Sequence, residues 1–167
     1  MNDAHTVLMI GGSGFIGRSL IQYYRLTSPS INIHSISKDE LDLELDTSGL
    51  RLRSIVNSIK PTIIIILAAI KRQLGDHLEL LESNNKIMKS ISFAISESMA
   101  KIVYFSSCAV YGEKNPQHNV DEMSALSPTS HYGEHKVLSE SLLINNIDPS
   151  KMLILRPPLI YSSDKNL

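Results

Sequence analysis

Residues 7–17 read VLMIGGSGFIG, in which a short apolar run stops at a turn that contains four glycines. Beyond the turn, apolar side chains at positions 16, 20, 21 and 24 recur at the spacing of one helix face. The stretch therefore predicts a strand, a tight turn and a helix in direct succession. This succession indicates a parallel sheet, because parallel neighbours need a crossover connection that is usually a helix.

Gly11, Gly14 and Gly17 meet three different physical needs of such a turn. One glycine allows the tight turn, one lets a pyrophosphate approach the backbone, and one lets the helix pack closely on the sheet. The N-terminus of the helix then offers free N–H groups to phosphate. These glycines, together with Phe15 and Ile16 between them, are the candidate contacts for the pyrophosphate of a dinucleotide.

The same letters also admit a nucleotide-triphosphatase loop. Residues 12–19 read G-x-x-x-x-G-R-S, and Arg18 stands where that loop carries the lysine that reaches the β- and γ-phosphates. No good strand-ending aspartate for magnesium is found either. The dinucleotide interpretation is therefore favoured over this alternative.

The rest of the chain alternates strand-like and helix-like stretches. Strands are expected near 31–36, 41–43, 62–69, 102–105 and 152–155, and helices at 16–26, 50–59, 84–99 and 130–144. Residues 63–70 are apolar throughout, which is typical of a central strand covered on both faces. The alternation predicts an α/β, doubly wound parallel sheet of the Rossmann type, with ligands at the carboxyl ends of its strands.

Composition narrows the class of protein. The chain has 167 residues, enough for one domain, and a formal net charge of −1 that gives no reason to expect nucleic acid or an anionic membrane as partner. The longest apolar run, 63–70, is too short to cross a bilayer. Cys108 is the single cysteine, and residues 1–5 do not resemble a secretion signal, so a cytoplasmic location is expected.

Tyr132 and Lys136 stand one helical turn apart in YGEHK, residues 132–136. A tyrosine hydroxyl has a pKa of about 10, too high for a base at neutral pH, and a nearby ammonium favours the phenolate. Ser107 follows an apolar strand in SSCAVYG, residues 106–112, where its hydroxyl could hydrogen-bond the substrate oxygen. Together the three side chains suggest acid–base catalysis by Tyr132.

The chain resembles the extended short-chain dehydrogenase/reductases, which include sugar-nucleotide epimerases, dehydratases and reductases. The resemblance rests on G-x-x-G-x-x-G at 11–17, S-S-x-x-V-Y-G at 106–112, Y-x-x-x-K at 132–136 and LRP at 155–157. It implies that Ser107 orients the substrate oxygen, Tyr132 is the acid/base, and Lys136 binds the nicotinamide ribose. It further implies cofactor contacts from residues that are matched to the family's motifs, namely Asp42, Leu43, Ala68, Ala69 and Asn84. Tight packing of the two alanines, and a helix cap at Asn84, are the competing interpretations.

Departures from the family pattern refine the expected activity. No aspartate ends the second expected strand; Ser37 and Lys38 follow it instead. A hydroxyl and a cation suit the 2′-phosphate of NADP, so the cofactor is expected to be NADP or NAD, with a preference for NADP. Cys108 and Ala109 stand where 4,6-dehydratases of the family carry an acidic pair, which disfavours a dehydratase. Ile10 and residues 161–163 also differ from the family pattern.

Members of this family usually continue into a smaller domain that holds the nucleotide sugar. Residues 1–167 are therefore expected to form an NAD(P)-binding domain that is incomplete at its C-terminus, with the substrate domain absent. Asp121 and Glu122, in the loop 113–131, are the candidates to line the substrate side. Two functions follow: an NAD(P)-dependent epimerase or reductase of a nucleotide sugar, or a dinucleotide-binding module or redox sensor without activity.

Two further expectations concern partners and metals. Family members commonly form dimers through helices that correspond to 84–99 and 130–146, so a homodimer is possible through the apolar residues Ile87, Ile91, Ile95, Leu138 and Leu142. These residues could instead face the sheet. Residues 131–135 also read H-x-x-E-H, the motif of one zinc-protease group, but no third ligand follows in sequence and no metal is expected.

Overall fold

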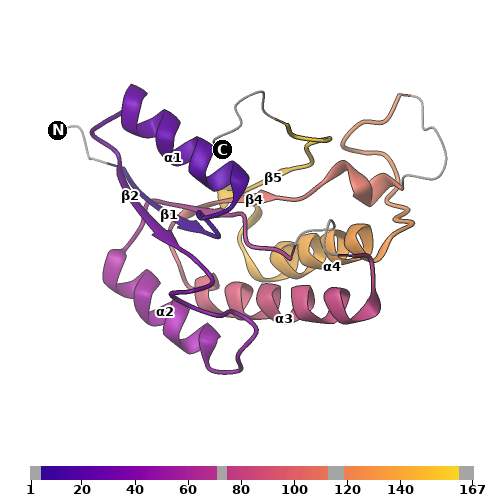
Figure 1. Cartoon of the computed structure of the whole chain (residues 1–167), viewed down its shortest axis with the longest axis horizontal. Coiled ribbons are helices and arrows are strands. Elements are labelled where there is room, and N and C mark those ends of the chain that lie inside the picture. Colours follow the sequence, from indigo (N-terminus) through magenta and orange to yellow (C-terminus); the bar gives the residue numbers. More distant parts are fainter. Residues whose placement is uncertain (1–4, 71–74, 113–118, 162–167) are drawn as a thin grey trace.

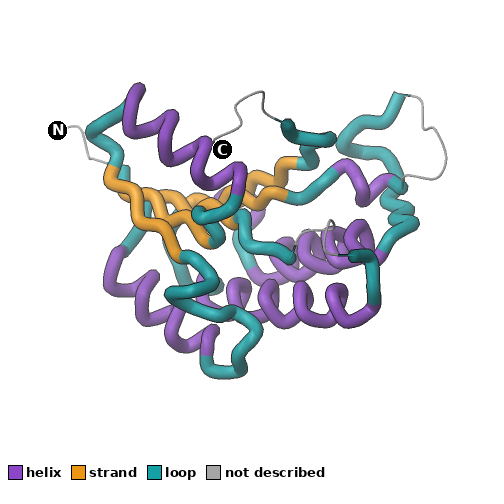
Figure 2. Tube along the Cα trace, in the orientation of Figure 1, coloured by secondary structure: helices purple, strands orange, loops and turns teal. Residues whose placement is uncertain are grey.

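The computed structural model describes residues 5–70, 75–112 and 119–161. Its centre is a parallel sheet with the strand order β2-β1-β3-β4-β5 (Figure 2). The strands are β1 (Thr6–Ile10), β2 (Asn32–Ile36), β3 (Ile63–Ile66), β4 (Lys101–Phe105) and β5 (Met152–Leu155). The predicted doubly wound parallel sheet is thus confirmed.

Helices cover both faces of this sheet. They are α1 (Phe15–Thr27), α2 (Ser48–Ile59), α3 (Leu78–Ile95) and α4 (His131–Asn146), with short 3₁₀ helices η2 (Cys108–Tyr111) and η3 (Pro149–Lys151). Helix α1 lies on one face, and α2, α3 and α4 lie on the other (Figure 1). Across these described residues, no helix combines the length and the apolar character that a membrane span needs.

The side chains of β1 divide between two apolar cores. Val7 and Met9 pack on the α1 side, whereas Leu8 and Ile10 pack on the side of α2, α3 and α4. All four are buried. Successive strand residues point to opposite faces of a sheet, so a strand covered on both sides must be apolar at every position. This explains why residues 7–10 form an unbroken apolar run.

The strand expected at 41–43 is wrong, and the sheet has five strands where the sequence suggested six. Residues 37–47 form a loop with local hydrogen bonds, among them Leu41 N–H to the Ser37 carbonyl at 3.0 Å. The alternation of leucine and acid arises because Leu41 and Leu43 reach into the larger core from this loop. Alternating polarity here reflects burial without strand pairing.

Two other elements, a helix and a strand, have ends that differ from those predicted from the sequence. Helix α3 begins at Leu78, six residues before the expected start, and ends at Ile95 instead of Met99. Strand β3 ends at Ile66, so Ala68 and Ala69 lie beyond the strand. In each case the apolar pattern marked the buried residues, while hydrogen bonding set the ends of the element.

The residues expected at a dimer interface differ in their burial in the structure. Ile87, Ile91 and Ile95 belong to the core between α3 and the sheet. Leu142 packs against the same core, whereas Leu138 is exposed. A homodimer stays a prediction, and the three isoleucines are not part of any surface it would use.

The strand order positions a ligand site. From β1 the chain passes outward to β2 and then returns to β3 on the other side of β1. In open α/β sheets, ligands bind at such a reversal, beyond the carboxyl ends of the strands. A cavity of about 960 Å³ lies at this edge.

Candidate functional site

The cavity extends across the sheet edge from the end of β2 to the ends of β4 and β5. All but one of the candidate cofactor-binding and catalytic residues line it: Gly11, Gly14, Phe15, Ile16, Gly17, Ser37, Lys38, Asp42, Leu43, Ala68, Ala69, Ser107, Tyr132 and Lys136. The exception is Asn84. Segments that are far apart in sequence therefore meet around one space.

The glycine turn between β1 and α1 leaves room where a ligand would approach. A Cβ on Gly17 would meet the Cα of Gly12 at 2.4 Å, so this glycine is required for close packing. Gly11 has a φ of +89° and also lies against the backbone of Ala68. A Cβ on Gly14, in contrast, would meet only the Gly11 carbonyl oxygen, at 3.4 Å. The space at Gly14 is open, and a phosphate can come close to the backbone there.

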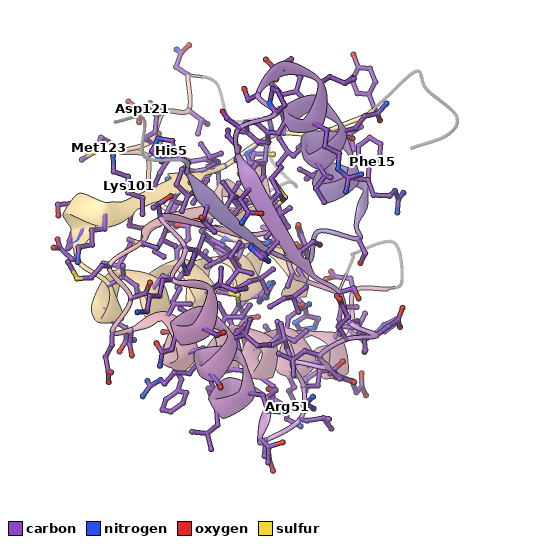
Figure 3. All side chains as sticks on the ribbon, turned by 90° about the vertical axis from the view of Figure 1, so that its left-hand side faces the viewer. His5, Phe15, Arg51, Lys101, Asp121 and Met123 are labelled. Carbon is purple, nitrogen blue, oxygen red and sulfur yellow. The ribbon has the colours of Figure 1, made fainter. Side chains whose placement is uncertain are left out.

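Helix α1 begins at this turn without a side-chain cap and without an acidic residue in its first turn. Both features keep the positive end of the helix dipole available to an anion. Phe15 opens the helix, and Figure 3 shows it on the opposite side of the view from Asp121 and Met123. Arg18 donates to the carbonyl of Ser13 at 2.6 Å.

The polar side chains that follow β2 make hydrogen bonds and ion pairs with one another. The Ser37 N–H and hydroxyl both donate to the Glu40 carboxylate, at 2.7 and 3.0 Å. Lys38 pairs with Glu44 at 2.8 Å and lies 3.9 Å from Asp42. The two groups expected to bind a 2′-phosphate therefore already have carboxylate partners.

The loop after β3 forms the wall between the two ends of the cavity. Ala68 packs against Gly11, and Leu67 N–H donates to the Ile10 carbonyl at 2.9 Å. Asn84 binds the backbone of Ile70 on both sides, accepting from its N–H at 2.7 Å and donating to its carbonyl at 3.3 Å. Asn84 is buried within α3 and is not the helix cap, which is at His77. From α3, Asn84 therefore holds the backbone of Ile70 in this wall in position.

Beyond β4, the chain turns into η2 with Ser107 as its cap. The Ser107 hydroxyl accepts from Ala109 N–H at 3.2 Å, and the residue is half-buried at the cavity. The strand itself ends at Phe105, as expected, and is the fourth in the chain, not the fifth. Ser107 therefore projects from a short rigid turn, with its side chain on the cavity wall.

Tyr132 and Lys136 lie on α4 facing this turn. The Lys136 ammonium donates to the carbonyl of Phe105 at 2.8 Å and lies 5.6 Å from the centre of the Tyr132 ring. Gly133 permits the approach, because a Cβ there would meet the Ala109 carbonyl oxygen at 2.6 Å. The sequence interpretation had no role for Gly133.

Burial makes the charged form of Lys136 energetically unfavourable. Desolvation lowers its pKa to about 7, against the opposing effect of the nearby Glu140 carboxylate, which raises it. Both the charged and the neutral form are therefore accessible near neutral pH. The lysine is held in place by a backbone carbonyl and by packing on the Tyr104 ring, 4.9 Å from its nitrogen.

Next to these residues lies a network of charged and polar side chains that was not identified from the sequence. Arg156 donates to the Glu140 carboxylate at 2.7 and 3.1 Å and to the Tyr111 hydroxyl at 2.6 Å. Ser106 also donates to Glu140. The signal was present: Glu140 follows Lys136 by one helical turn, as Lys136 follows Tyr132, and Arg156 belongs to the LRP motif.

The two histidines of the H-x-x-E-H stretch have different surroundings. His135 is buried beside Ser139, and burial lowers its pKa to about 3, with the charge of Lys136 as the second cause. His131 is near Glu134, with 3.6 Å between Nδ1 and the carboxylate. Among the described residues, no three histidine, cysteine, aspartate or glutamate side chains are grouped as metal ligands.

The candidates for the substrate side do not line the cavity. Asp121 accepts from the N–H of Met123 and the hydroxyl of Ser124 in a local turn, and the Glu122 carbonyl accepts from Arg156. Residues 113–118 of the same loop lie outside the described residues. Pro157, Pro158 and the residues that follow them to position 161 form the wall on the β5 side.

These features fit a dinucleotide. The open space at Gly14 and the uncapped start of α1 suit a pyrophosphate, and the cavity continues from there to Tyr132 and Lys136 in one direction and to Ser37 in the other. In such a fit the nicotinamide end of the molecule would lie beside α4 and the adenosine end beside β2.

Comparisons with known proteins agree with this geometry. The model of the NAD dependent epimerase/dehydratase family matches residues 7–166. Sterol-4-alpha-carboxylate 3-dehydrogenase, decarboxylating, from Saccharomyces cerevisiae is 25% identical over 183 residues, covering 96% of this chain and 52% of that protein. N-acetyl-alpha-D-glucosaminyl-diphospho-ditrans,octacis-undecaprenol 4-epimerase from Escherichia coli O157:H7 is 27% identical over 172 residues, covering 96% and 50%.

A solved structure shares the fold. The dTDP-4-dehydrorhamnose reductase from Bacillus anthracis, in complex with NADP, superposes with a TM-score of 0.82 at 24% identity over 96% of this chain and 56% of the reductase. The chain spans about half the length of the curated relatives it matches.

Proposed function

The chain belongs to the NAD dependent epimerase/dehydratase family, and from this we propose that it binds NAD(P) and acts as an epimerase or reductase on a nucleotide sugar. The observation that carries the proposal is the single cavity shared by the glycine turn, Ser107, Tyr132 and Lys136. A dinucleotide bound there supplies the hydride acceptor or donor. The protein contributes binding, orientation and proton transfer.

Tyr132 is the proposed acid/base. In the oxidative direction its phenolate takes the proton from a sugar hydroxyl as the hydride leaves the carbon that bears this hydroxyl. In the reductive direction the phenol returns the proton to the carbonyl oxygen. The ammonium of Lys136, 5.6 Å from the ring centre, favours the phenolate electrostatically.

Ser107 is proposed to orient the substrate oxygen. Its hydroxyl stands on the cavity wall and already accepts one hydrogen bond from Ala109 N–H, so its proton is available to donate to an oxygen in the cavity. Such a donor supports the charge that develops on the oxygen as the proton moves. The role requires no displacement of η2.

Two of the three relatives act on a sugar that is joined to a diphosphate, which supports the proposed substrate class. One is a 3-dehydrogenase of a sterol carboxylate, one a 4-epimerase of a diphospho-linked sugar, and one a reductase of a dTDP-sugar. Their shared chemistry is hydride transfer at a carbon that bears oxygen. A nucleotide sugar is the substrate we propose for this chain.

The test combines binding and turnover. Purified protein is titrated with NADH and NADPH by nicotinamide fluorescence, and nucleotide sugars are then screened for epimerisation or for oxidation and reduction. We expect micromolar binding, and turnover that Tyr132→Phe lowers by about a thousandfold while the dinucleotide affinity is kept. Full activity of Tyr132→Phe would overturn the catalytic role.

The alternative function is a dinucleotide-binding module or redox sensor without activity. The observation in its favour is that the chain spans about half the length of its curated relatives. Binding without turnover on any nucleotide sugar would support this alternative. Turnover by the 167-residue chain would exclude it.

A further inference from the structure

The pairing between β4 and β5 continues past the end of β4. The Ser106 N–H donates to the Leu155 carbonyl at 2.7 Å, and the Cys108 N–H donates to the Pro157 carbonyl at 3.0 Å. These two hydrogen bonds extend the parallel ladder to the wall of the cavity. Between the two donors lies Ser107, the residue proposed to orient the substrate oxygen.

Helix α4 holds this extension through two of its side chains. The Lys136 ammonium donates to the Phe105 carbonyl at 2.8 Å. One helical turn later, the Glu140 carboxylate accepts from the hydroxyl of Ser106, which is buried. Two consecutive residues of the chain that leads into Ser107 are therefore attached to α4.

Arg156 connects the segment after β5 to the same carboxylate. Its guanidinium donates to both oxygens of Glu140, at 2.7 and 3.1 Å, and to the Tyr111 hydroxyl of η2 at 2.6 Å. The side chain of Glu140 is 2% exposed. One buried carboxylate thus receives donors from the segments that follow β4 and β5.

The chemistry of this contact favours direction over stability. Compared with an apolar pair of the same size, a buried ion pair gains little net stability, because its attraction roughly offsets the loss of hydration. A two-pronged arginine–carboxylate pair does fix the relative orientation of its two planar groups. Breaking the pair leaves a buried charge unpaired, so a useful test variant has to keep it.

We propose that Glu140 is a positioning residue for the proposed reaction. Through Ser106 and Arg156 it holds the segments that follow β4 and β5 against α4. The Ser107 hydroxyl is thereby fixed relative to Tyr132 across the cavity. Glu140 itself is not among the described residues that line this cavity, so it acts through its partners. The inference rests on the proposed function, which gives Ser107 and Tyr132 their roles.

Ser106→Ala is the main test, because it removes one hydroxyl and leaves Glu140 paired with Arg156. Native-state hydrogen exchange of the Cys108 N–H, followed by NMR without ligand, measures whether the turn stays paired with Pro157. We expect this N–H to exchange about tenfold faster relative to the slowest core amides. On a nucleotide sugar found in the screen, kcat should fall about tenfold while the NADH dissociation constant is kept.

Glu140→Asp is the second variant, because it withdraws the carboxylate by one methylene group and keeps its charge. We expect the same two effects to be larger, with kcat about a hundredfold lower. Ser106→Ala gives a result even where Glu140→Asp does not fold, which circular dichroism melting verifies.

Ser139→Ala is the matched control. Ser139 precedes Glu140 on α4, is 1% exposed, and donates its hydroxyl to the His135 carbonyl of the same helix at 2.8 Å. The variant removes an equally buried hydroxyl without touching the residues around Ser107. We expect both the relative exchange rate of the Cys108 N–H and kcat to stay within about twofold of the wild-type values.

Three results would overturn the inference alone. They are a Cys108 N–H without protection in the wild type, a relative exchange rate unchanged in both Ser106→Ala and Glu140→Asp, and a kcat that both variants leave unchanged. Folded wild-type protein that binds no dinucleotide, or turns over no nucleotide sugar, would overturn the proposed function and the positioning role with it.

Discussion

The Asp76 carboxylate accepts a 3.0 Å hydrogen bond from the backbone N–H of Tyr132, which lies 56 residues further along the chain. The Ser130 hydroxyl caps the same helix end by accepting from Gly133 N–H at 3.1 Å. Two neighbouring N–H groups in the first turn of α4 are thus satisfied by side chains from different segments. The segment before α3 is thereby connected to the backbone of the proposed acid/base.

We predict that Asp76→Ala destabilises the chain by about 1 kcal/mol, as expected for the loss of a capping acceptor. Asp76→Asn keeps an acceptor oxygen but loses the favourable charge at the helix N-terminus, so its cost should be about half as large. Urea unfolding at pH 7 measures both. Equal losses for the two variants would mean that charge, and not the hydrogen bond, provides the stabilisation.

Gly14→Ala and Gly17→Ala form a matched pair within one turn. A Cβ at position 17 meets the Gly12 backbone at 2.4 Å, so this variant should lose on the order of 2 kcal/mol of stability or fail to fold. A Cβ at position 14 meets no atom closer than 3.4 Å, so that variant should stay folded. It should nevertheless bind a dinucleotide at least tenfold more weakly, because the methyl group occupies the space for the pyrophosphate. A Gly14→Ala protein with unchanged affinity would place the pyrophosphate elsewhere.

The buried Lys136 gives the stability a defined pH dependence. Burial lowers its pKa in the folded chain to about 7, whereas an unfolded lysine titrates near 10.5. Between these values the unfolded chain holds the extra proton, so the contribution of Lys136 to stability rises with pH by up to about 1.4 kcal/mol per unit. Below pH 7 both states are protonated, and the full penalty of burial remains. Above pH 10.5 both are neutral, and the penalty is gone.

Lys136→Met should remove that pH-dependent component. The measurement is the free energy of unfolding in urea from pH 7 to pH 10, with the variant subtracted from the wild type to cancel the other titrating groups. We expect the difference to rise with pH in favour of the wild type. A flat difference would contradict a lowered pKa for Lys136.

Glu140 and Glu97 both pair with arginine and differ mainly in burial. The side chain of Glu140 is 2% exposed, and that of Glu97 is 81% exposed. Glu140→Gln leaves the Arg156 guanidinium and the buried Lys136 without their anion, so a loss of about 3–5 kcal/mol is expected. Glu97→Gln removes a solvent-screened contact to Arg53 and should cost less than about 1 kcal/mol. Thermal unfolding of both variants measures the contrast, and similar losses would refute it.

Local sequence patterns predicted most elements because each pattern directly reports burial. The apolar run before the glycine turn, the spacing of apolar residues in α1, and strand β5 at 152–155 lie where they were expected. The failure at 41–43 has a physical cause: leucines two residues apart can reach the core from a loop as well as from a strand. Periodicity reports which side chains are buried, but not which backbone groups are paired.

The candidate site likewise contains residues that the sequence predicted and residues that it did not. The glycine turn and the pair Tyr132 and Lys136 were found in sequence because their spacing is local, within one turn or one helix. Asp76 with Tyr132 and Glu140 with Arg156 were not found, because these partners are separated in the chain and meet only when α3, α4 and β5 pack together.

The sequence by itself determined the class of fold, the position of the glycine turn and the identity of the proposed catalytic side chains. Each of these follows from a short stretch whose chemistry is independent of its neighbours. Only the tertiary structure decided the environment of those side chains: the burial that lowers the pKa of Lys136, and the Glu40 carboxylate that holds the donors of Ser37. Desolvation and charge depend on every group that packs nearby, and packing is a property of the whole fold.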